Sequence, residues 1–235
     1  MSSPHDKLIV ALDFPAATPA LEFVSRLEGS CSWFKVGLEL YLAAGNSVVE
    51  DLCKRGHSVF LDLKLHDIPN TVAGGVRSAA AIGASLLTVH SLGGPAMIEA
   101  AANELAKLQS PPKLLAVTLL TSMDEAQMRS VGLMNASEAQ VLQLAQMARK
   151  AGADGVVASP LETAALRKAL GTDALLVIPG IRAADADGDD QRRTATPAAA
   201  IADGASMLVV GRPITRAVDP AATARGILSQ IAAVS

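Results

Sequence analysis

Eight short apolar runs that alternate with alanine-rich helical patterns predict an α/β fold, a single closed (β/α)8 TIM barrel. Half of the 235 residues are apolar but only 3% are aromatic, which suits aliphatic parallel strands covered by closely packed helices. No Ser/Gly-rich linker or block of charge divides the chain, so one domain over residues 1–235 is expected. In a barrel of this class, sites form at the carboxyl ends of the strands.

The expected strands are β-branched or leucine-rich runs. In chain order they are Leu8 to Phe14, Trp33 to Leu40, Ser58 to Leu65, Leu86 to Ser91, Leu114 to Ser122, Gly155 to Ser159, Leu175 to Pro179 and Met207 to Gly211. Helical patterns follow most of them, for example Thr18 to Glu28, Ser47 to Arg55, Pro69 to Ile82 and Pro95 to Leu108. Residues 1–6 are expected to form a short N-terminal tail. The small, acidic, aperiodic segment 183–193 predicts a mobile loop, either a lid or a plain solvated loop.

Charge and composition exclude several classes of function. The formal net charge of -3 and the pI near 5.8 argue against a general affinity for nucleic acid, which needs a concentrated basic face. The N-terminus has no apolar signal core, and no run approaches the roughly 18 apolar residues that cross a bilayer, so we expect a cytoplasmic protein without a membrane partner. Cys31 and Cys53 have no metal-binding spacing and are interpreted as small buried hydrophobic residues in a reducing compartment.

Charged side chains are expected to enter the barrel from three neighbouring strands. Asp62 and Lys64 alternate with leucines along the third strand, so they point inward when the leucines face the helices. The same alternation turns Lys35 of the second strand and Asp13 of the first strand inward. A buried ion-pair network that only fills the barrel is one interpretation. Four titratable groups together at the mouth favour instead a catalytic site for a small phosphorylated substrate.

A long motif at the third strand identifies a family. The string FLDLKLHDIPNTV, which spans residues 60–72, closely resembles the signature of orotidine 5′-phosphate decarboxylases. Further matches along nearly the whole chain are Asp13 in ALD, Lys35 in FKVG, Thr121 in LLTS, Arg182 in PGIR, Gln191, and Gly211 and Arg212 in VVGRPI. The resemblance implies a barrel enzyme, usually a homodimer, that converts orotidine 5′-phosphate to UMP and CO2 in de novo pyrimidine biosynthesis with no cofactor and no metal.

The resemblance also implies the catalytic residues. Lys35, Asp62, Lys64 and an Asp67 contributed by the second subunit would form a network of alternating charge. Lys64 would stabilise the carbanion left at C6 of the pyrimidine and donate the proton to it. Asp67 and Thr71 would reach the ribose bound by the neighbouring subunit, so each active site would be shared across the dimer.

The resemblance further implies a set of substrate-binding residues. They are Asp13, Ile68, Thr71, Thr121, Ser122, Arg182, Gln191, Gly211 and Arg212, in addition to the charge network. Asp13 would hydrogen-bond a ribose hydroxyl, while Arg182 and Arg212 would hold the phosphate at strands seven and eight. Gln191 would join as the lid closes. A competing interpretation of residues 68–71 is that they only start a helix, since Pro is favoured in a first turn and Asn or Thr near a cap.

Two other functions stay open. One is a magnesium-dependent relative with the same Asp-x-Lys-x-x-Asp core, such as a sugar-phosphate decarboxylase or a hexulose-phosphate synthase. In those relatives an acidic residue on strand two helps to hold the metal, and Lys35 at that position cannot ligate a hard cation. The other is a non-catalytic barrel that binds nucleotides or serves in assembly. His66 and His90 are assigned no catalytic role, because lone histidines are more often structural.

Overall fold

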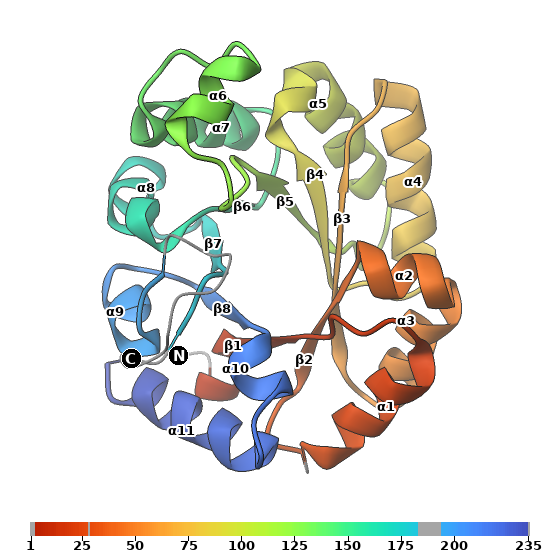
Figure 1. Cartoon of the computed structure of the whole chain (residues 1–235). Coiled ribbons are helices and arrows are strands. Elements are labelled where there is room, and N and C mark those ends of the chain that lie inside the picture. Colours follow the sequence, from red (N-terminus) through yellow and green to blue (C-terminus); the bar gives the residue numbers. More distant parts are fainter. Residues whose placement is uncertain (1–2, 28, 183–193, 235) are drawn as a thin grey trace.

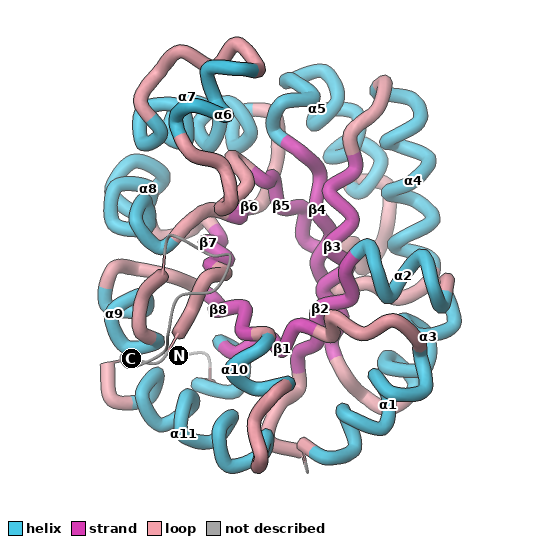
Figure 2. Tube along the Cα trace, viewed as in Figure 1, coloured by secondary structure: helices cyan, strands magenta, loops and turns pink. Residues whose placement is uncertain are grey.

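The computed structural model describes residues 3–27, 29–182 and 194–234, in which eight parallel strands close into a barrel ringed by helices (Figure 1). The strands are β1 (Leu8–Ala11), β2 (Trp33–Gly37), β3 (Ser58–Leu65), β4 (Leu86–His90), β5 (Lys113–Val117), β6 (Gly155–Val157), β7 (Leu175–Ile178) and β8 (Met207–Val210). Each strand pairs with the next along the chain, and β8 pairs with β1. Figure 2 shows this ring of strands viewed along the axis of the barrel. The predicted (β/α)8 barrel is confirmed.

Helices cover the outside of the ring. They are α1 (Ala17–Arg26), α2 (Leu38–Ala44), α3 (Asn46–Lys54), α4 (Pro69–Ala81), α5 (Gly94–Leu105), α6 (Glu125–Ser130), α7 (Ser137–Lys150), α8 (Thr163–Leu170), α9 (Pro197–Ala202), α10 (Arg212–Thr215) and α11 (Pro220–Ala232), with the 3-10 turns η1 (Pro4–Lys7), η2 (Ser91–Gly93) and η3 (Pro160–Glu162). Within the described ranges, every helix is too short or too polar to span a membrane.

The segment expected as an N-terminal tail is structured from Pro4 onward. Ser3 and Asp6 cap the turn η1 reciprocally: the Ser3 hydroxyl accepts from the His5 N–H at 3.3 Å, and the Asp6 carboxylate accepts from the Ser3 N–H at 3.0 Å. The turn contacts β1, β8 and α11. These contacts show that residues 4–6 of the expected tail are packed on the barrel, while residues 1 and 2 lie outside the described residues.

Alternation along the strands divides the core into two clusters. Side chains such as Val10 and Leu61 pack between the strands and the helices, whereas their neighbours Ile9 and Phe60 point into the barrel. The inner cluster contains Ile9, Ala11, Phe60, Leu86, Leu115, Val177, Met207 and Val209. These side chains fill the interior of the barrel, as expected for this fold. The polar inward-facing positions therefore lie at the mouth.

Several predicted strands are too long. The second run was expected to continue to Leu40, but β2 ends at Gly37 and α2 begins at Leu38. The prediction failed because the apolar residues after Gly37 were interpreted as strand residues, although they belong to a surface helix. Leu38 and Leu42 of α2 are 51% and 79% exposed. The first and fifth predicted strands are also too long, since β1 ends at Ala11 and β5 ends at Val117. The residues that follow them form loops at the mouth of the barrel.

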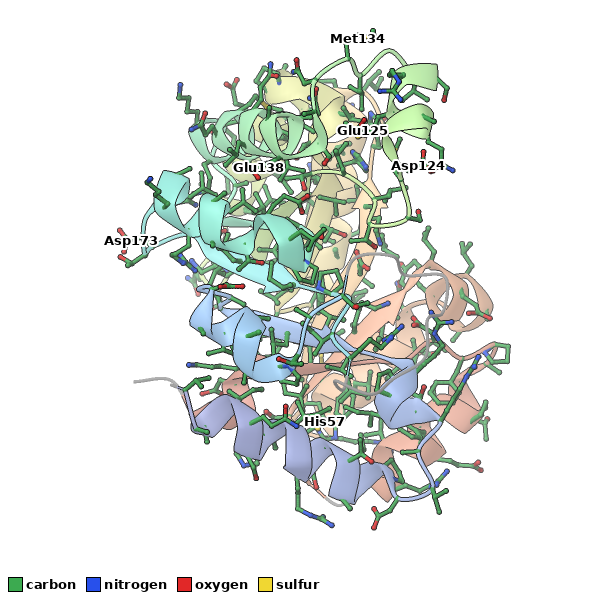
Figure 3. The ribbon with its side chains drawn as sticks, turned by 60° about the vertical axis from the view of Figure 1, so that its left-hand side comes forward. His57, Asp124, Glu125, Met134, Glu138 and Asp173 are labelled. Carbon is green, nitrogen blue, oxygen red and sulfur yellow. The ribbon has the colours of Figure 1, made fainter. Side chains whose placement is uncertain are left out.

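The connection from β5 to α7 is anchored at the edge of the barrel. The carboxylate of Asp124 accepts from the Gln127 N–H at 2.9 Å, and the Gln127 side chain accepts from the Asp124 N–H at 3.1 Å, which starts α6. Figure 3 shows Asp124, Glu125 and Met134 together at this outer edge, far from His57. The sequence did not predict α6. Its anchoring leaves residues 119–121, just before it, over the barrel mouth.

The two cysteines differ in their surroundings. Cys31 is buried, and burial raises the pKa of its thiol to about 12. Cys53 is half-buried, and its thiol donates to the Gly83 carbonyl at 3.3 Å. The interpretation as a buried hydrophobic residue is therefore confirmed for Cys31 and holds only in part for Cys53.

Candidate active site

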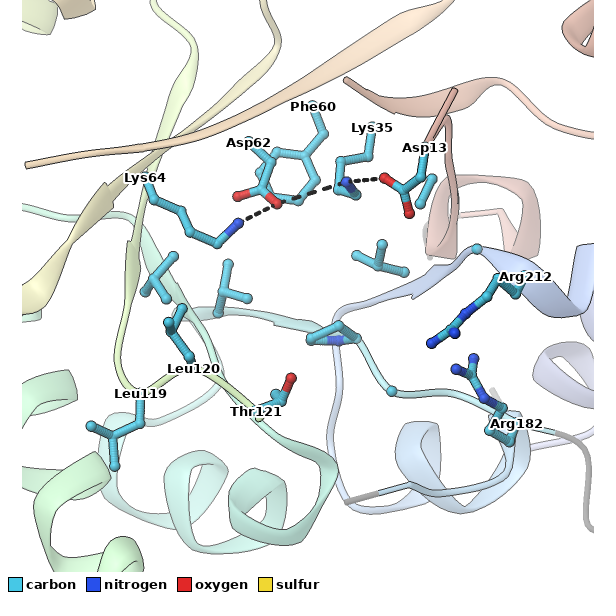
Figure 4. Close-up of a pocket in the computed structure, with 17 residues that line it drawn as sticks. Asp13, Lys35, Phe60, Asp62, Lys64, Leu119, Leu120, Thr121, Arg182 and Arg212 are labelled. Carbon is cyan, nitrogen blue, oxygen red and sulfur yellow. Dashed lines mark hydrogen bonds and ion pairs between the residues drawn. The ribbon is translucent and has the colours of Figure 1, made fainter. Parts of the chain in front are cut away.

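A cavity of about 240 Å³ opens at the carboxyl ends of the strands (Figure 4). The predicted site residues that line it are Asp13, Lys35, Asp62, Lys64, Thr121, Arg182, Gly211 and Arg212. Sequence reasoning missed the apolar part of the lining, which includes Phe60, Leu119 and Leu120. Phe60 could have been identified because it shares the inward face of β3 with Asp62. The two leucines belong to a loop, where alternation gives no guidance.

Four side chains form a row of alternating charge along one wall. The Lys35 ammonium lies 3.0 Å from Asp13 Oδ1 and 3.9 Å from Asp62 Oδ2. The Lys64 ammonium lies 2.8 Å from the same Asp62 oxygen. The side chains of Lys35 and Asp62 are only 12% and 11% exposed, so these two charges are largely removed from water and compensate one another. Strands β2 and β3 and the loop that follows β1 therefore bring the inward charges together.

The end of β3 departs from regular strand geometry at Lys64. Leu61 pairs with Leu87 of β4 and Leu65 with Val89, so β3 advances by four residues while β4 advances by two. Lys64 has a φ of 51°, the single positive value among the described non-glycine residues. Such a conformation costs about 1–3 kcal/mol and is typical of functional sites. The ammonium of Lys64 is thereby directed back onto Asp62 (Figure 4).

Two guanidinium groups lie at the other end of the cavity. Arg182 follows β7, and Arg212 is the first residue of α10 after β8. Figure 4 shows both guanidinium groups directed into the cavity opposite Lys64, with the Thr121 hydroxyl also pointing inward. Gly211 lies beside Asp13 here, and a Cβ at this position would be in ordinary van der Waals contact with Asp13 Oδ2 at 3.5 Å. This end offers two cations to an anionic group.

Four predicted residues lie outside the cavity of this chain. Asp67, Ile68, Thr71 and Ser122 are exposed, and Asp67 Oδ1 accepts a hydrogen bond from the Ile68 N–H at 2.6 Å. Helix α4 begins at Pro69 with Ile68 as its N-cap and no side-chain cap. Pro69 therefore starts the helix as the competing interpretation holds, but Thr71 does not cap it. Gln191 and the expected lid at 183–193 lie outside the described residues.

A pair of histidines adjoins the row of charges. The rings of His66 and His90 stack with centroids 5.5 Å apart, and His90 Nδ1 accepts from the Leu92 N–H at 3.3 Å. Burial, and after it the nearby His66 and Lys64, lowers the pKa of the His90 imidazole. These surroundings favour the neutral form of the His90 imidazole.

Thr88 is a polar residue that sequence reasoning missed at this site. It lies on β4 between Leu86 and His90, on the face that points into the barrel, and it is fully buried. Its hydroxyl donates to Asp62 Oδ1 at 3.0 Å and accepts from the Lys64 N–H at 2.8 Å. A signal was available: a threonine at an inward position next to the charged third strand.

Comparison with known proteins adds independent information. Residues 6–227 match the model of a family described as "Orotidine 5'-phosphate decarboxylase / HUMPS family". Similar curated proteins include the orotidine 5′-phosphate decarboxylases of Nitrosospira multiformis, 51% identical over 92% of this chain and 89% of the relative, and of Alkalilimnicola ehrlichii, 50% identical over 97% of both. The crystal structure of orotidine 5′-phosphate decarboxylase from Lactobacillus acidophilus is similar with a TM-score of 0.86 at 41% identity, over 96% of this chain and 99% of that one.

Proposed function

The chain belongs to the orotidine 5′-phosphate decarboxylase / HUMPS family, and from that premise we propose that it is the carboxy-lyase that converts orotidine 5′-phosphate to UMP and CO2 in pyrimidine biosynthesis. The observation that carries the proposal is the row of Asp13, Lys35, Asp62 and Lys64 facing a cavity whose far end holds two arginines. A nucleotide that carries a phosphate at one end and a carboxylate at the other matches this distribution of charge. Because such a charged nucleotide does not cross membranes unaided, we place the enzyme in the cytoplasm.

Lys64 is the proton donor in the proposed mechanism. The phosphate binds to Arg182 and Arg212, which sets the pyrimidine carboxylate beside Asp62. The bond between C6 and the carboxyl carbon then breaks, CO2 leaves, and the electron pair stays on C6. The Lys64 ammonium, held by Asp62 at 2.8 Å, stabilises this carbanion and transfers a proton to it. Lys64 recovers its proton from water, so no cofactor is needed.

Substitution of Lys64 tests this role. Lys64→Ala should lower kcat by at least about a thousandfold, because it removes both the stabilising charge and the proton donor. UMP should still bind, since the arginines are intact. Lys113→Ala is a matched control, because Lys113 is an exposed lysine that pairs with Asp154 at 2.9 Å and is absent from the cavity lining. Turnover of Lys64→Ala close to that of the control would refute the assignment.

The magnesium-dependent relatives are the main rival within the family. A hard cation prefers several oxygen ligands, but Lys35 places its ammonium between the carboxylates of Asp13 and Asp62. Decarboxylation of orotidine 5′-phosphate should therefore continue unchanged in excess EDTA. Loss of activity that magnesium restores would favour a metal-assisted reaction and count against the proposal.

We further propose that the enzyme is a homodimer with shared active sites. Residues 67–71 form an exposed stretch in which Ile68 is 67% exposed. Leu92, 41% exposed, follows His90, whose ring stacks on that of His66 next to this stretch. A contiguous apolar patch rimmed by polar residues is typical of an interface, and Ile68 and Leu92 are the exposed apolar side chains that such a patch would use. A second subunit seated here would bring Asp67 and Thr71 to its neighbour's cavity.

Mixing two inactive variants tests the shared site. Lys64→Ala and Asp67→Ala should each be inactive alone, but a mixed dimer contains one site with both defects and one intact site. Random reassortment of equal amounts should restore about a quarter of native activity, since half of the dimers are mixed and half of their sites are intact. No recovery, with mixed dimers verified by differential tagging, would refute sharing. Sedimentation of the native chain as a monomer would refute the dimer itself.

A further inference from the structure

We propose that Thr88 is a positioning residue for the decarboxylation, and that its hydroxyl sets the geometry of both Asp62 and Lys64. This inference rests on the proposed roles of those two residues and deepens them. Thr88 is absent from the lining of the cavity, so it acts through its neighbours and not on the substrate.

The irregular pairing of β3 and β4 creates the need for such a residue. Between the pairs Leu61–Leu87 and Leu65–Val89, the three residues 62–64 lie opposite the single residue Thr88. The ladder is disrupted at this point, as at a β-bulge, and Lys64 takes its positive φ there. The Thr88 hydroxyl oxygen accepts the Lys64 N–H at 2.8 Å, so a side chain supports the backbone where the sheet ladder is interrupted.

The same hydroxyl also donates a hydrogen bond to the carboxylate of Asp62. Thr88 Oγ1 donates to Asp62 Oδ1 at 3.0 Å, while Asp62 Oδ2 is bound by the Lys64 ammonium at 2.8 Å. Both oxygens of the carboxylate are therefore held, which fixes its rotation about the Cβ–Cγ bond. A hydroxyl has one donor and can accept at the same time, so one group meets both demands.

Burial makes this arrangement sensitive to small changes. Thr88 has 0% exposure, so water has no direct access to replace its hydroxyl. Removal of the hydroxyl leaves the Lys64 N–H and the Asp62 oxygen each short of a partner. The strained turn and the carboxylate then lose a shared restraint, and the Lys64 ammonium is held less precisely against C6. Small errors in the position of a catalytic group reduce the rate of the chemical step.

Three variants separate positioning from general packing. Thr88→Val keeps the shape of the side chain and removes the hydroxyl, whereas Thr88→Ser keeps the hydroxyl. Thr163→Val is the control, because Thr163 is equally buried at 0% exposure and donates one hydrogen bond, to the Ser159 carbonyl at 3.3 Å, at the start of α8. For each variant, kcat and KM for orotidine 5′-phosphate, the Kd of UMP and the urea midpoint are measured.

Thr88→Val should lower kcat by about tenfold or more, the loss expected when two buried hydrogen bonds at the reacting groups are removed. Its KM and its Kd for UMP should stay within about twofold of native, since the phosphate-binding arginines are untouched. Thr88→Ser should restore kcat to within about threefold of native, and Thr163→Val should keep native kcat even where its urea midpoint falls.

Several results would overturn the inference. They are native kcat in Thr88→Val, a Thr88→Ser variant as slow as Thr88→Val, or an equal loss of kcat in the control. If Thr88→Val does not fold, Thr88→Cys replaces it, because a thiol is only a weak donor and acceptor. Lys64→Ala is assayed in parallel. An active Lys64→Ala means that the proposed function fails, whereas an inactive Lys64→Ala beside a native-like Thr88→Val means that only the role of Thr88 fails.

Discussion

Arg167 forms hydrogen bonds to both chain segments that precede the last two strands. Its guanidinium donates to the carbonyl of Gly204 at 3.0 and 2.8 Å, to the carbonyl of Ala174 at 2.9 Å and to the hydroxyl of Ser206 at 3.0 Å. A further bond reaches the carbonyl of Gly171 at 2.5 Å. These acceptors lie just before β7 and β8, at the end of the barrel opposite the cavity, where residues serve stability and not catalysis.

The effect of Arg167→Met can be worked from these bonds. Methionine keeps the unbranched stem and removes every donor. Gly171 is exposed, so water replaces its bond, whereas Ala174 is buried and Gly204 and Ser206 are half-buried. Three acceptors at about 0.5–1.5 kcal/mol each would cost about 3 kcal/mol. Burial lowers the pKa of the Arg167 guanidinium, so removing this charge also removes a desolvation cost. We therefore expect a net loss of about 2 kcal/mol, or about 4–8 °C in Tm for a chain of this length.

Urea unfolding followed by fluorescence measures this loss. Trp33 is the single tryptophan of the chain and packs against the inner cluster of the barrel, so its emission reports on the barrel itself. Protein concentration is held constant, because subunit association would add to apparent stability. Arg129→Met is the matched control: Arg129 pairs with Glu125 at 3.4 Å on the surface, and its loss should change stability by less than about 0.5 kcal/mol. Equal urea midpoints for the two variants would refute the reasoning. So would a lowered kcat of Arg167→Met at urea concentrations well below its unfolding transition.

Two further predictions concern the stability of the fold, one through a cluster of charges on the outer helices and one through the packing of two strands. Glu104 accepts hydrogen bonds from Arg77 and Lys107, which lower the pKa of its carboxyl to about 2 from 4.5, so its contribution to stability is complete above pH 4.5 and is lost as the pH falls towards 2. The free energy of unfolding of Glu104→Gln, measured in urea at successive pH values, should fall less steeply across this window than that of the native protein, and identical slopes would contradict this. Gly155 of β6 pairs with Leu175 of β7, and a Cβ at this glycine would collide with the Leu175 backbone carbonyl. Gly155→Ala should therefore lose about 2–3 kcal/mol of stability in the same urea assay, and a native midpoint would show that the strands separate at little cost.

Much of the candidate site could be predicted from local patterns. The inward direction of Lys35 and Asp62 follows from alternation along regular strands, which is a property of the backbone. Asp13 lies just beyond β1 and Lys64 lies in the irregular end of β3, and both also line the cavity. Arg182 and Arg212 could be assigned only through the family motif. Their local sequence does not indicate that two loops more than twenty residues apart meet at one cavity.

Alternation fails where the chain leaves the regular strand. It could not reveal the irregular turn at Lys64, because the register shift there depends on how β3 meets β4 and not on β3 alone. It also extended the second strand to Leu40, because the apolar residues of a surface helix such as α2 cannot be told from those of a strand by their identity alone.

By itself, the sequence determined the barrel, the order of its strands and the charged residues at its mouth, because each follows from a repeating pattern of apolar and polar positions. Only the tertiary structure decided how those charges are held. The bridge from Thr88 to both Asp62 and Lys64 joins strands whose facing residues are more than twenty positions apart, and its existence depends on a shift in pairing of two residues. The structure also placed Asp67 on the surface, outside the cavity of its own chain. The physical reason is that alternation specifies the direction of a side chain, whereas a contact also requires the register of its neighbour.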